Sequence, residues 1–247
     1  MWKKMYSAVL VCLVCMAFAT VAAAAELPAA DVKDVPAEKP ERIELVLVLD
    51  KSGSMQGLES DTIGGFNSMI EKQKKLDVPV RVTAVLFNDK TDVLYASKDI
   101  RHVAPLTEKE YEVGGTTALL DAVGSTVLNV GRESVVQNKG TKVIFVIITD
   151  GLENASREFK KSKVKQMISD KQEKAGWDFI YLGANIDAAE EADAIGVQRS
   201  NAVTYRNTKS GVRANYDAVS AFVEEAAERG TAASAKWRSH VEEDASK

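Results

Sequence analysis

The chain has 247 residues, of which 45% are hydrophobic and 28% are charged, and its formal net charge is −4. This length suits one domain of about 190 residues with terminal segments, or two small domains. The acidic balance, in a sequence without a basic cluster that carries interleaved aromatic residues, disfavours nucleic acid as a partner.

The first 25 residues have the three-part pattern of a secretory signal peptide, with two lysines, an apolar run and an alanine-rich junction at 22–25. The run is short for a membrane span, which takes about 20 apolar residues, and a retained N-terminal anchor is the alternative. Both cysteines, Cys12 and Cys15, lie in this leader, so the mature chain would contain no disulfide. The leader predicts an exported protein, periplasmic or secreted, without a stable membrane span after cleavage.

Composition also sets the bounds of the predicted domain. Residues 26–41 contain three of the five prolines and predict an extended linker. Residues 231–247 show no clear apolar stripe and predict a flexible or helical tail. The folded domain is therefore expected to span residues 42–230.

Within this domain, apolar runs alternate with helical patterns. In chain order we expect a strand at 43–50, a helix at 60–75, strands at 80–88 and 92–97, a helix at 118–131, a strand at 142–150, a helix at 157–174, a strand at 177–185, and helices at 186–196 and 214–230. Ser60 or Asp61 is expected to cap the first helix. The Gly64-Gly65 pair inside it indicates close packing of the helix on the sheet, with a hinge as the alternative.

Strands that are separated by helices of this length pair in parallel through right-handed crossovers. The sequence therefore predicts an α/β fold with a doubly wound, mostly parallel central sheet flanked by helices, of Rossmann-like type. In such sheets, binding sites form beyond the carboxyl ends of the strands, at the point where the strand order reverses. The strand ends are thus the first place to look for a site.

Side chains that carry oxygen gather at these ends. Asp50, Ser52 and Ser54 follow one buried strand, Asp150 ends another, and Thr116 and Thr117 precede a helix. Each has an ordinary explanation as a cap or turn residue, but together they form an oxygen-rich set without histidine or cysteine. Such a set suits a hard divalent cation, Mg²⁺ or Mn²⁺, with Ca²⁺ as a further option.

The segments "DKSGSM", "GGTTALLDAV" and "VIITDGLEN" resemble the three parts of the metal-ion-dependent adhesion site of von Willebrand factor type A domains. The resemblance extends over residues 42–225, and two further stretches, "TIGGFNSMIEKQK" and "GWDFIYLGANIDAA", resemble a bacterial secreted subgroup of these domains.

The resemblance implies a role for each residue of the set. Ser52 and Ser54 would bind the cation through their hydroxyls, and Thr117 would bind it directly or through water. Asp50 and Asp150 would act largely through water or through other ligands. Thr117 fits the family's spacing to the helix better than Thr116, although the doubled threonine leaves that choice open.

The resemblance also implies a protein-binding module for adhesion or scaffolding, and the predicted leader makes it extracytoplasmic. Neutral Ser and Thr ligands leave the charge of the cation poorly neutralised, so the cation would coordinate an Asp or Glu of a partner protein. An alternative is a divalent-metal hydrolase with Asp50, Asp150 and Asp187 as ligands, but neither His102 nor His240 stands out as a general base. A subunit that partners a ring ATPase is harder to reconcile with export. We therefore expect a binding protein rather than an enzyme.

Overall fold

The computed structural model describes residues 38–230 and 235–246. The predicted leader, residues 1–25, lies outside these ranges, as do residues 26–37 of the predicted linker and residues 231–234 and 247 of the predicted tail. Within the described ranges, the chain contains no helix long and apolar enough to cross a membrane.

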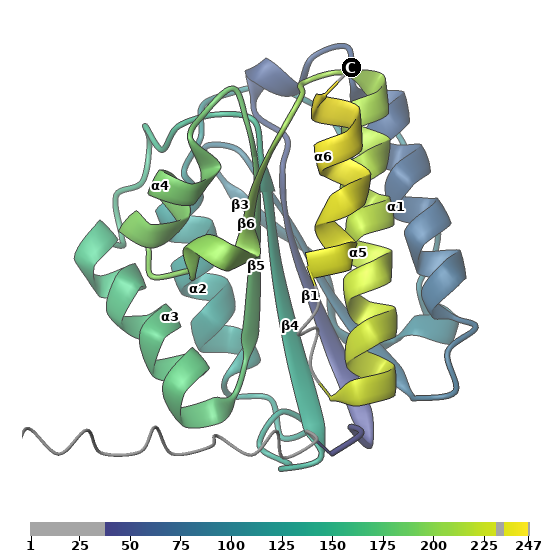
Figure 1. The fold of residues 1–247 in the computed structure, drawn as a ribbon. Helices are drawn as coiled ribbons and strands as arrows, with labels where there is room; N and C mark the ends of the chain where they lie inside the picture. The colour runs from purple at the N-terminus through teal and green to yellow at the C-terminus, as the bar shows by residue number, and fades with distance from the viewer. Residues whose placement is uncertain (1–37, 231–234, 247) are drawn as a thin grey trace, which may run out of the picture. The chain divides into compact units, whose positions relative to one another are not determined.

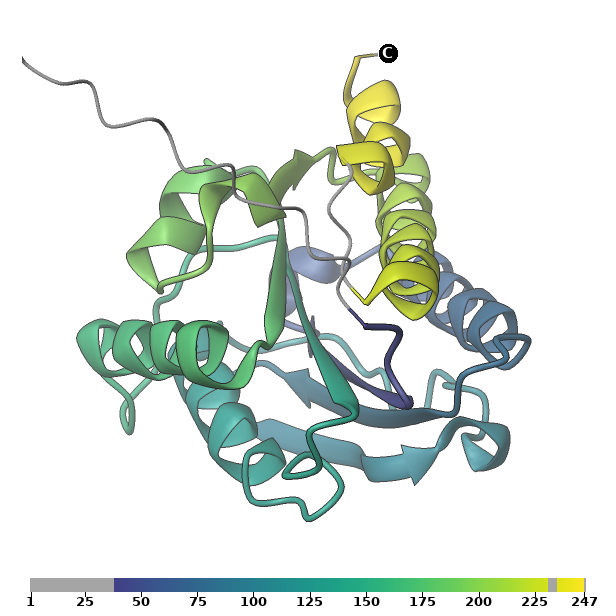
Figure 2. The same ribbon diagram turned by 60° about the horizontal axis from the view of Figure 1, so that its bottom comes forward.

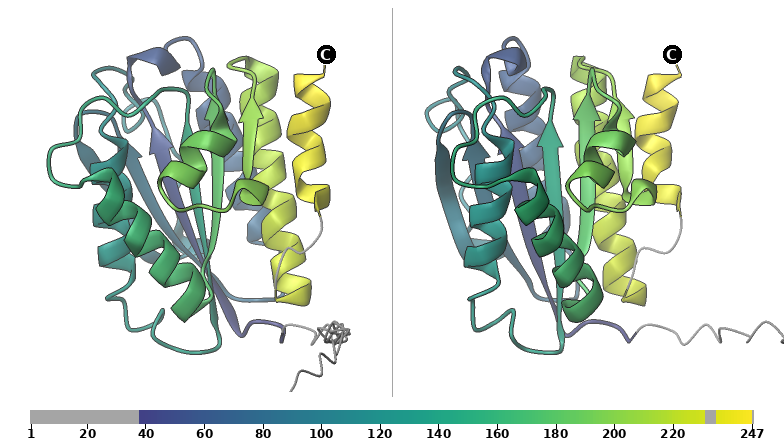
Figure 3. Two further views of the ribbon diagram at one scale, coloured as in Figure 1. Left: turned by 60° about the vertical axis from the view of Figure 1, so that its left-hand side comes forward. Right: turned by 90° about the vertical axis from the view of Figure 1, so that its left-hand side faces the viewer.

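Six strands form one sheet in the order β3-β2-β1-β4-β5-β6. They are β1 (Arg42–Asp50), β2 (Val80–Phe87), β3 (Thr91–Asp99), β4 (Thr141–Thr149), β5 (Asp178–Ala184) and β6 (Ala202–Tyr205). The β2–β3 pair is antiparallel and the other pairs are parallel, which confirms the predicted mostly parallel sheet and its hairpin. The order reverses between β1 and β4, so the carboxyl ends of these two strands define the switch point. Figure 3 shows the parallel strands with their arrowheads at the upper end.

Helices cover both faces of the sheet (Figures 1 and 2). One face carries α1 (Glu59–Gln73), α5 (Lys209–Arg229) and α6 (Ser239–Ala245), and the other carries α2 (Leu119–Val130), α3 (Lys161–Ala175) and α4 (Ala188–Ala194). Short 3-10 turns lie at η1 (Gly53–Met55), η2 (Ile100–His102), η3 (Arg199–Asn201) and η4 (Ala235–Arg238). The fold is thus a doubly wound α/β sandwich of three layers.

The central strand β1 is buried on both faces, as its continuous apolar run predicts. Leu45 and Leu47 pack in the core beneath α1 and α5, whereas Val46 and Val48 pack in the core beneath α2 and α3. Successive side chains of a strand point to opposite faces, so one run of apolar residues supplies both cores. This double burial holds the carboxyl end of β1 firmly in the middle of the sheet.

Two predicted helix starts are wrong. Helix α3 begins at Lys161 rather than 157, because the backbone N–H groups of 157–159 donate to the carboxylate of Asp121 instead of entering a helix. Helix α5 begins at Lys209 rather than 214, and the hydroxyl of Thr208 caps it by accepting from the N–H of Gly211.

The start of α1 also differs from the prediction. Its N-cap is Leu58, and Ser60 and Asp61 lie inside the first turn. Asp61 forms an ion pair with Arg213 of α5, with the two atoms 2.7 Å apart, so its side chain serves the contact between helices instead of the helix end.

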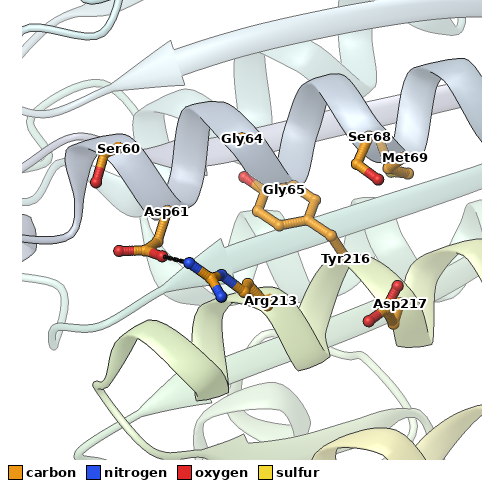
Figure 4. A pocket seen from close by; sticks show the side chains of 9 residues that line it. All are labelled: Ser60, Asp61, Gly64, Gly65, Ser68, Met69, Arg213, Tyr216 and Asp217. Atoms are coloured by element: carbon orange, nitrogen blue, oxygen red, sulfur yellow. Dashed lines mark hydrogen bonds and ion pairs between the residues drawn. The ribbon is translucent and has the colours of Figure 1, made fainter.

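One glycine of the pair in α1, Gly65, lies against another helix rather than against the sheet. A Cβ atom on Gly65 would lie 2.3 Å from Cδ2 of Tyr216, whereas one on Gly64 would meet no atom within 4 Å. Figure 4 shows the Tyr216 ring lying against α1 at this point, beside a cavity of about 350 Å³ between the two helices. The predicted close packing is therefore present, but its partner is α5.

The structure adds a strand that the sequence patterns did not reveal, and it shows where the predicted tail packs. Strand β6 has only four residues, too few to show a periodicity, and it extends the sheet beyond β5. The described part of the predicted tail is helical and packs on α5, where the ring of Trp237 meets that of Phe222 edge-on with centroids 5.5 Å apart.

Candidate metal site

The predicted site residues lie at the carboxyl ends of β1 and β4 and at the start of α2. Asp50, Ser52, Thr117 and Asp150 are buried, and Ser54 is exposed. They belong to three loops that are widely separated in the sequence. The three loops meet at the switch point of the sheet.

The loop after β1 turns because Asp50 organises it. Oδ1 of Asp50 accepts a hydrogen bond from the N–H of Ser52 at 2.7 Å, which is the local turn that aspartate favours. The N–H of Gly53 donates to the carbonyl of Gly115, and the N–H of Gly114 donates to the carbonyl of Lys51. These backbone bonds join the first loop to the loop that precedes α2.

Two hydroxyls and one carboxylate form the centre of the site. The hydroxyl of Ser54 donates to Oδ1 of Asp150 at 2.6 Å, and the hydroxyl oxygens of Ser52 and Ser54 lie 3.1 Å apart. A Cβ atom on Gly151 would lie 3.4 Å from Oγ1 of Thr117 and 3.6 Å from Oγ of Ser54. The third hydroxyl, that of Thr117, therefore flanks the same glycine as Ser54. The structure brings together the residues that the sequence singled out.

Asp50 is held on both sides by protein donors. Besides the N–H of Ser52 on Oδ1, the hydroxyl of Thr149 donates to Oδ2 at 2.7 Å. The hydroxyl of Tyr111 donates to the backbone carbonyl of Asp50. Thr149 and Tyr111 were not predicted as site residues, and no sequence signal distinguishes them from other core residues.

Asp150 receives a donor from a part of the chain that was not predicted to reach the site. The side-chain amide of Asn207 donates to Oδ2 of Asp150 at 3.1 Å. Asn207 follows β6 and precedes the cap of α5, so its position depends on a strand that the sequence patterns did not indicate. Asn207 directly precedes Thr208, the N-cap of α5, and this neighbourhood is the local feature that could have drawn attention to it.

The structure also distinguishes between the two threonines. Thr117 is buried and its N–H donates to Oδ1 of Asn154 at 2.9 Å, while the N–H of Asn154 donates back to the carbonyl of Thr117. Thr116 is exposed. Thr117 is thus the threonine whose side chain lies in the cluster, in agreement with the preference drawn from spacing.

The loop after Asp150 is fastened to the beginning of α2. The carboxylate of Glu153 accepts from the N–H groups of Leu120 and Ser156, and Asp121 accepts from the N–H of Phe159. Leu152 lies on this fastened loop with its side chain 55% exposed. The rim of the site is therefore ordered by hydrogen bonds without being covered.

Burial makes both carboxylates of the site costly to ionise. Desolvation raises the pKa of Asp50, against hydrogen bonds from Ser52 and Thr149 that lower it, and the charge of Asp150 raises it further. Desolvation likewise raises the pKa of Asp150, against hydrogen bonds from Ser54 and Asn207. A bound cation would stabilise both charged forms, so the electrostatics of the site fit a cation.

The residues considered for the hydrolase alternative, Asp187 as a ligand and the two histidines as general bases, have other positions or roles. Asp187 caps α4 by accepting from the N–H of Glu190. His102 lies in η2 and His240 in α6, and both are exposed. Within residues 38–230 and 235–246 there is no group of three or more His, Cys, Asp or Glu residues that could hold a metal ion. A cation at this site would therefore depend on the hydroxyls.

Solved structures share this arrangement of strands and helices. Proximal thread matrix protein 1 from the mussel byssus matches over 74% of this chain and 46% of its own, with a TM-score of 0.54 and 15% identity. Another structure of that mussel protein, with the same coverage and TM-score, has a zinc-occupied MIDAS motif. A von Willebrand factor type A structure from Catenulispora acidiphila matches over 74% of this chain and 42% of its own, with a TM-score of 0.52 and 13% identity. These matches span less than half of each solved chain. No protein-family model and no curated protein matches the sequence.

Proposed function

The chain has the fold of von Willebrand factor type A domains, and on that premise we propose that it is a divalent-cation-dependent protein-binding module. The observation that carries the proposal is the meeting of Ser52, Ser54 and Asp150 at the switch point, with hydroxyl oxygens 3.1 Å apart and a 2.6 Å bond to the carboxylate. Residues from separate loops that converge in this way form a ready set of oxygen ligands.

The hydroxyls of Ser52, Ser54 and Thr117 would hold the cation, and the carboxylates would orient them. Asp150 already accepts a hydrogen bond from the hydroxyl of Ser54, which leaves the lone pairs of that hydroxyl free to face a cation. Asp50 holds the turn on which both serines lie. Mg²⁺ and Mn²⁺ suit this set, because a small octahedral cation binds few protein oxygens and keeps several waters.

A partner carboxylate would complete the coordination. Three neutral hydroxyls leave most of the charge of the cation uncompensated, which favours an anionic ligand from outside. The rim allows such an approach, since Ser54, Gly115 and Thr116 are exposed and Leu152 offers an apolar side chain beside them. The partner is therefore a protein that presents an Asp or Glu side chain.

The role that we propose is binding rather than catalysis, and it lies outside the cytoplasm. The position of Asp187 at a helix cap and the exposure of both histidines favour binding over metal-dependent hydrolysis. The export signal is the sequence of the first 25 residues. N-terminal sequencing of the mature protein tests it, and we expect a start at Glu26 or within a few residues.

The experiment that tests the site compares two neighbouring threonines. Calorimetric titration with MgCl₂ and MnCl₂ should show binding to the wild type and about a tenfold or greater loss of affinity in Thr117→Ala. Thr116→Ala is the matched control, because Thr116 is exposed and is expected to leave the affinity unchanged. A wild-type protein that binds neither cation would overturn the proposal.

A further inference from the structure

Every oxygen of the two site carboxylates is already engaged by a donor of the protein. Asp50 accepts from the N–H of Ser52 on Oδ1 and from the hydroxyl of Thr149 on Oδ2. Asp150 accepts from the hydroxyl of Ser54 on Oδ1 and from the amide of Asn207 on Oδ2. Each of these four oxygens therefore has one of its two lone-pair sites taken by a donor of the protein.

Asn207 is the donor in this set that comes from the loop after the edge strand β6. It lies between β6 and the α5 cap, so the sheet and a helix of 21 residues hold its backbone. Its NH₂ group faces Asp150, because the opposite orientation would set two oxygens against each other. Oδ1 of Asn207 is buried without a hydrogen-bond partner. A buried acceptor without a partner lowers the stability of the fold, so the hydrogen bond of Asn207 to Asp150 is present despite an energetic cost at the other end of the same amide.

Cations differ in what they require of a carboxylate. Ca²⁺ takes six to eight oxygen ligands and readily uses both oxygens of one carboxylate, whereas Mg²⁺ keeps a tight octahedral shell with several waters. We propose that Asn207 determines the cation selectivity of this site. Because its amide holds Oδ2 from a fixed backbone, Asn207 restricts the rotation of the Asp150 carboxylate, and this disfavours the two-oxygen contact that Ca²⁺ readily uses. The inference rests on the proposed cation site, and Asn207 acts in it as a positioning residue through Asp150.

Asn207→Ala tests this role without changing the charge of the site. The purified wild type and the variant are titrated with MgCl₂ and CaCl₂ in a calorimeter, and the ratio of the two affinities is compared. Without the amide, the Asp150 carboxylate keeps only the hydroxyl of Ser54, which can rotate with it, so both oxygens can turn toward Ca²⁺. We therefore expect the affinity for Ca²⁺ relative to that for Mg²⁺ to rise by about tenfold or more. Asn201→Ala is the matched control, because Asn201 lies in η3, before β6.

A merely structural role for Asn207 would lower both affinities together and lower the melting temperature of the cation-free protein. A ratio that stays within about twofold of the wild type, in a variant that melts like the wild type, overturns the inference and leaves the proposed function standing. If Asn207→Ala does not fold, Asn207→Leu gives the same comparison, because it removes the donor while it fills a similar volume. A wild type that binds neither cation overturns the proposed function and this inference with it.

Discussion

The hydroxyl oxygen of Ser54 lies 2.6 Å from Oδ1 of Asp150, although 96 positions separate the two residues in the chain. The contact joins the loops that follow β1 and β4, the two neighbouring strands between which the strand order reverses. A short hydrogen bond from a hydroxyl to a carboxylate is among the stronger contacts of its kind. The candidate site is therefore built across the switch point and not within one loop.

Asp150→Asn should separate cation binding from stability. Burial raises the pKa of Asp150, so its charge is unfavourable in the cation-free fold, and the neutral amide should leave the melting temperature equal or higher. The wild type should gain about 2.7 kcal/mol when Mg²⁺ is present at about 100 times its Kd, and the variant should gain far less. Thermal melts with chelator and with excess Mg²⁺ measure both effects. A variant that keeps the full Mg²⁺-dependent gain would remove Asp150 from the site.

Partner binding should depend on the cation and on Thr117. Chelator should abolish binding of the partner protein, and Mg²⁺ or Mn²⁺ should restore it. Thr117→Ala should weaken it by about tenfold to several hundredfold, because a charge-assisted contact through the cation is lost. Affinity is measured for Thr117→Ala and for the exposed control Thr116→Ala, both with wild-type melting temperatures. Equal affinities in the two variants would show that the partner does not engage the cation.

The two adjacent glycines of α1 should respond oppositely to alanine. Gly65→Ala places a Cβ atom 2.3 Å from the ring of Tyr216, and forcing α1 and α5 apart should cost about 1–3 kcal/mol (Figure 4). Gly64→Ala meets no atom within 4 Å and should stabilise the helix by about 0.5–1 kcal/mol. Chemical denaturation of both variants checks the pair. A hinge at this position would instead make both substitutions alter cation or partner binding.

Glu44 should make stability depend on pH. This carboxyl is buried on β1, where it accepts from the hydroxyls of Thr83 and Ser97 at 2.7 Å. Desolvation raises its pKa above the usual 4.5, so the folded protein holds this proton more tightly than the unfolded chain. The resulting stability is fully present below about pH 4.5 and is lost as the pH rises through the higher folded-state pKa.

Glu44→Gln should flatten this part of the pH profile, because the amide keeps the shape of the side chain without a charge. The exposed control Glu108→Gln should keep the wild-type profile. Urea denaturation of the three proteins between pH 4 and pH 8 measures the difference. If the pH profile of Glu44→Gln matches that of the wild type, a group other than Glu44 causes the pH dependence of stability.

Local patterns were sufficient to predict the main strands and most of the site. The apolar run of β1 predicts burial on both faces, and the aspartate that ends it predicts a turn, because both effects act over a few residues. Thr117 and Asp150 are likewise marked by their places at a helix start and a strand end. Since the carboxyl ends of parallel strands share one edge, the predicted parallel pairing places these residues at the same edge of the sheet, and the observed strand order brings them together.

Only the tertiary structure decided which groups surround them. Thr117 is buried and exchanges two hydrogen bonds with Asn154 from another loop, which no local pattern relates to it, whereas Thr116 is exposed. Strand β6 is too short to be recognised from a sequence pattern, and the position of Asn207, which donates to Asp150, depends on this strand. The sequence by itself determined which oxygen-bearing residues stand at the strand ends, because the preferences that form caps and turns act over only a few neighbouring residues. Apart from the N–H of Ser52, the donors to Asp50 and Asp150 come from distant segments of the chain, namely Thr149, Ser54 and Asn207. Only the tertiary structure brings them to these oxygens, where they influence how the oxygens can bind a cation.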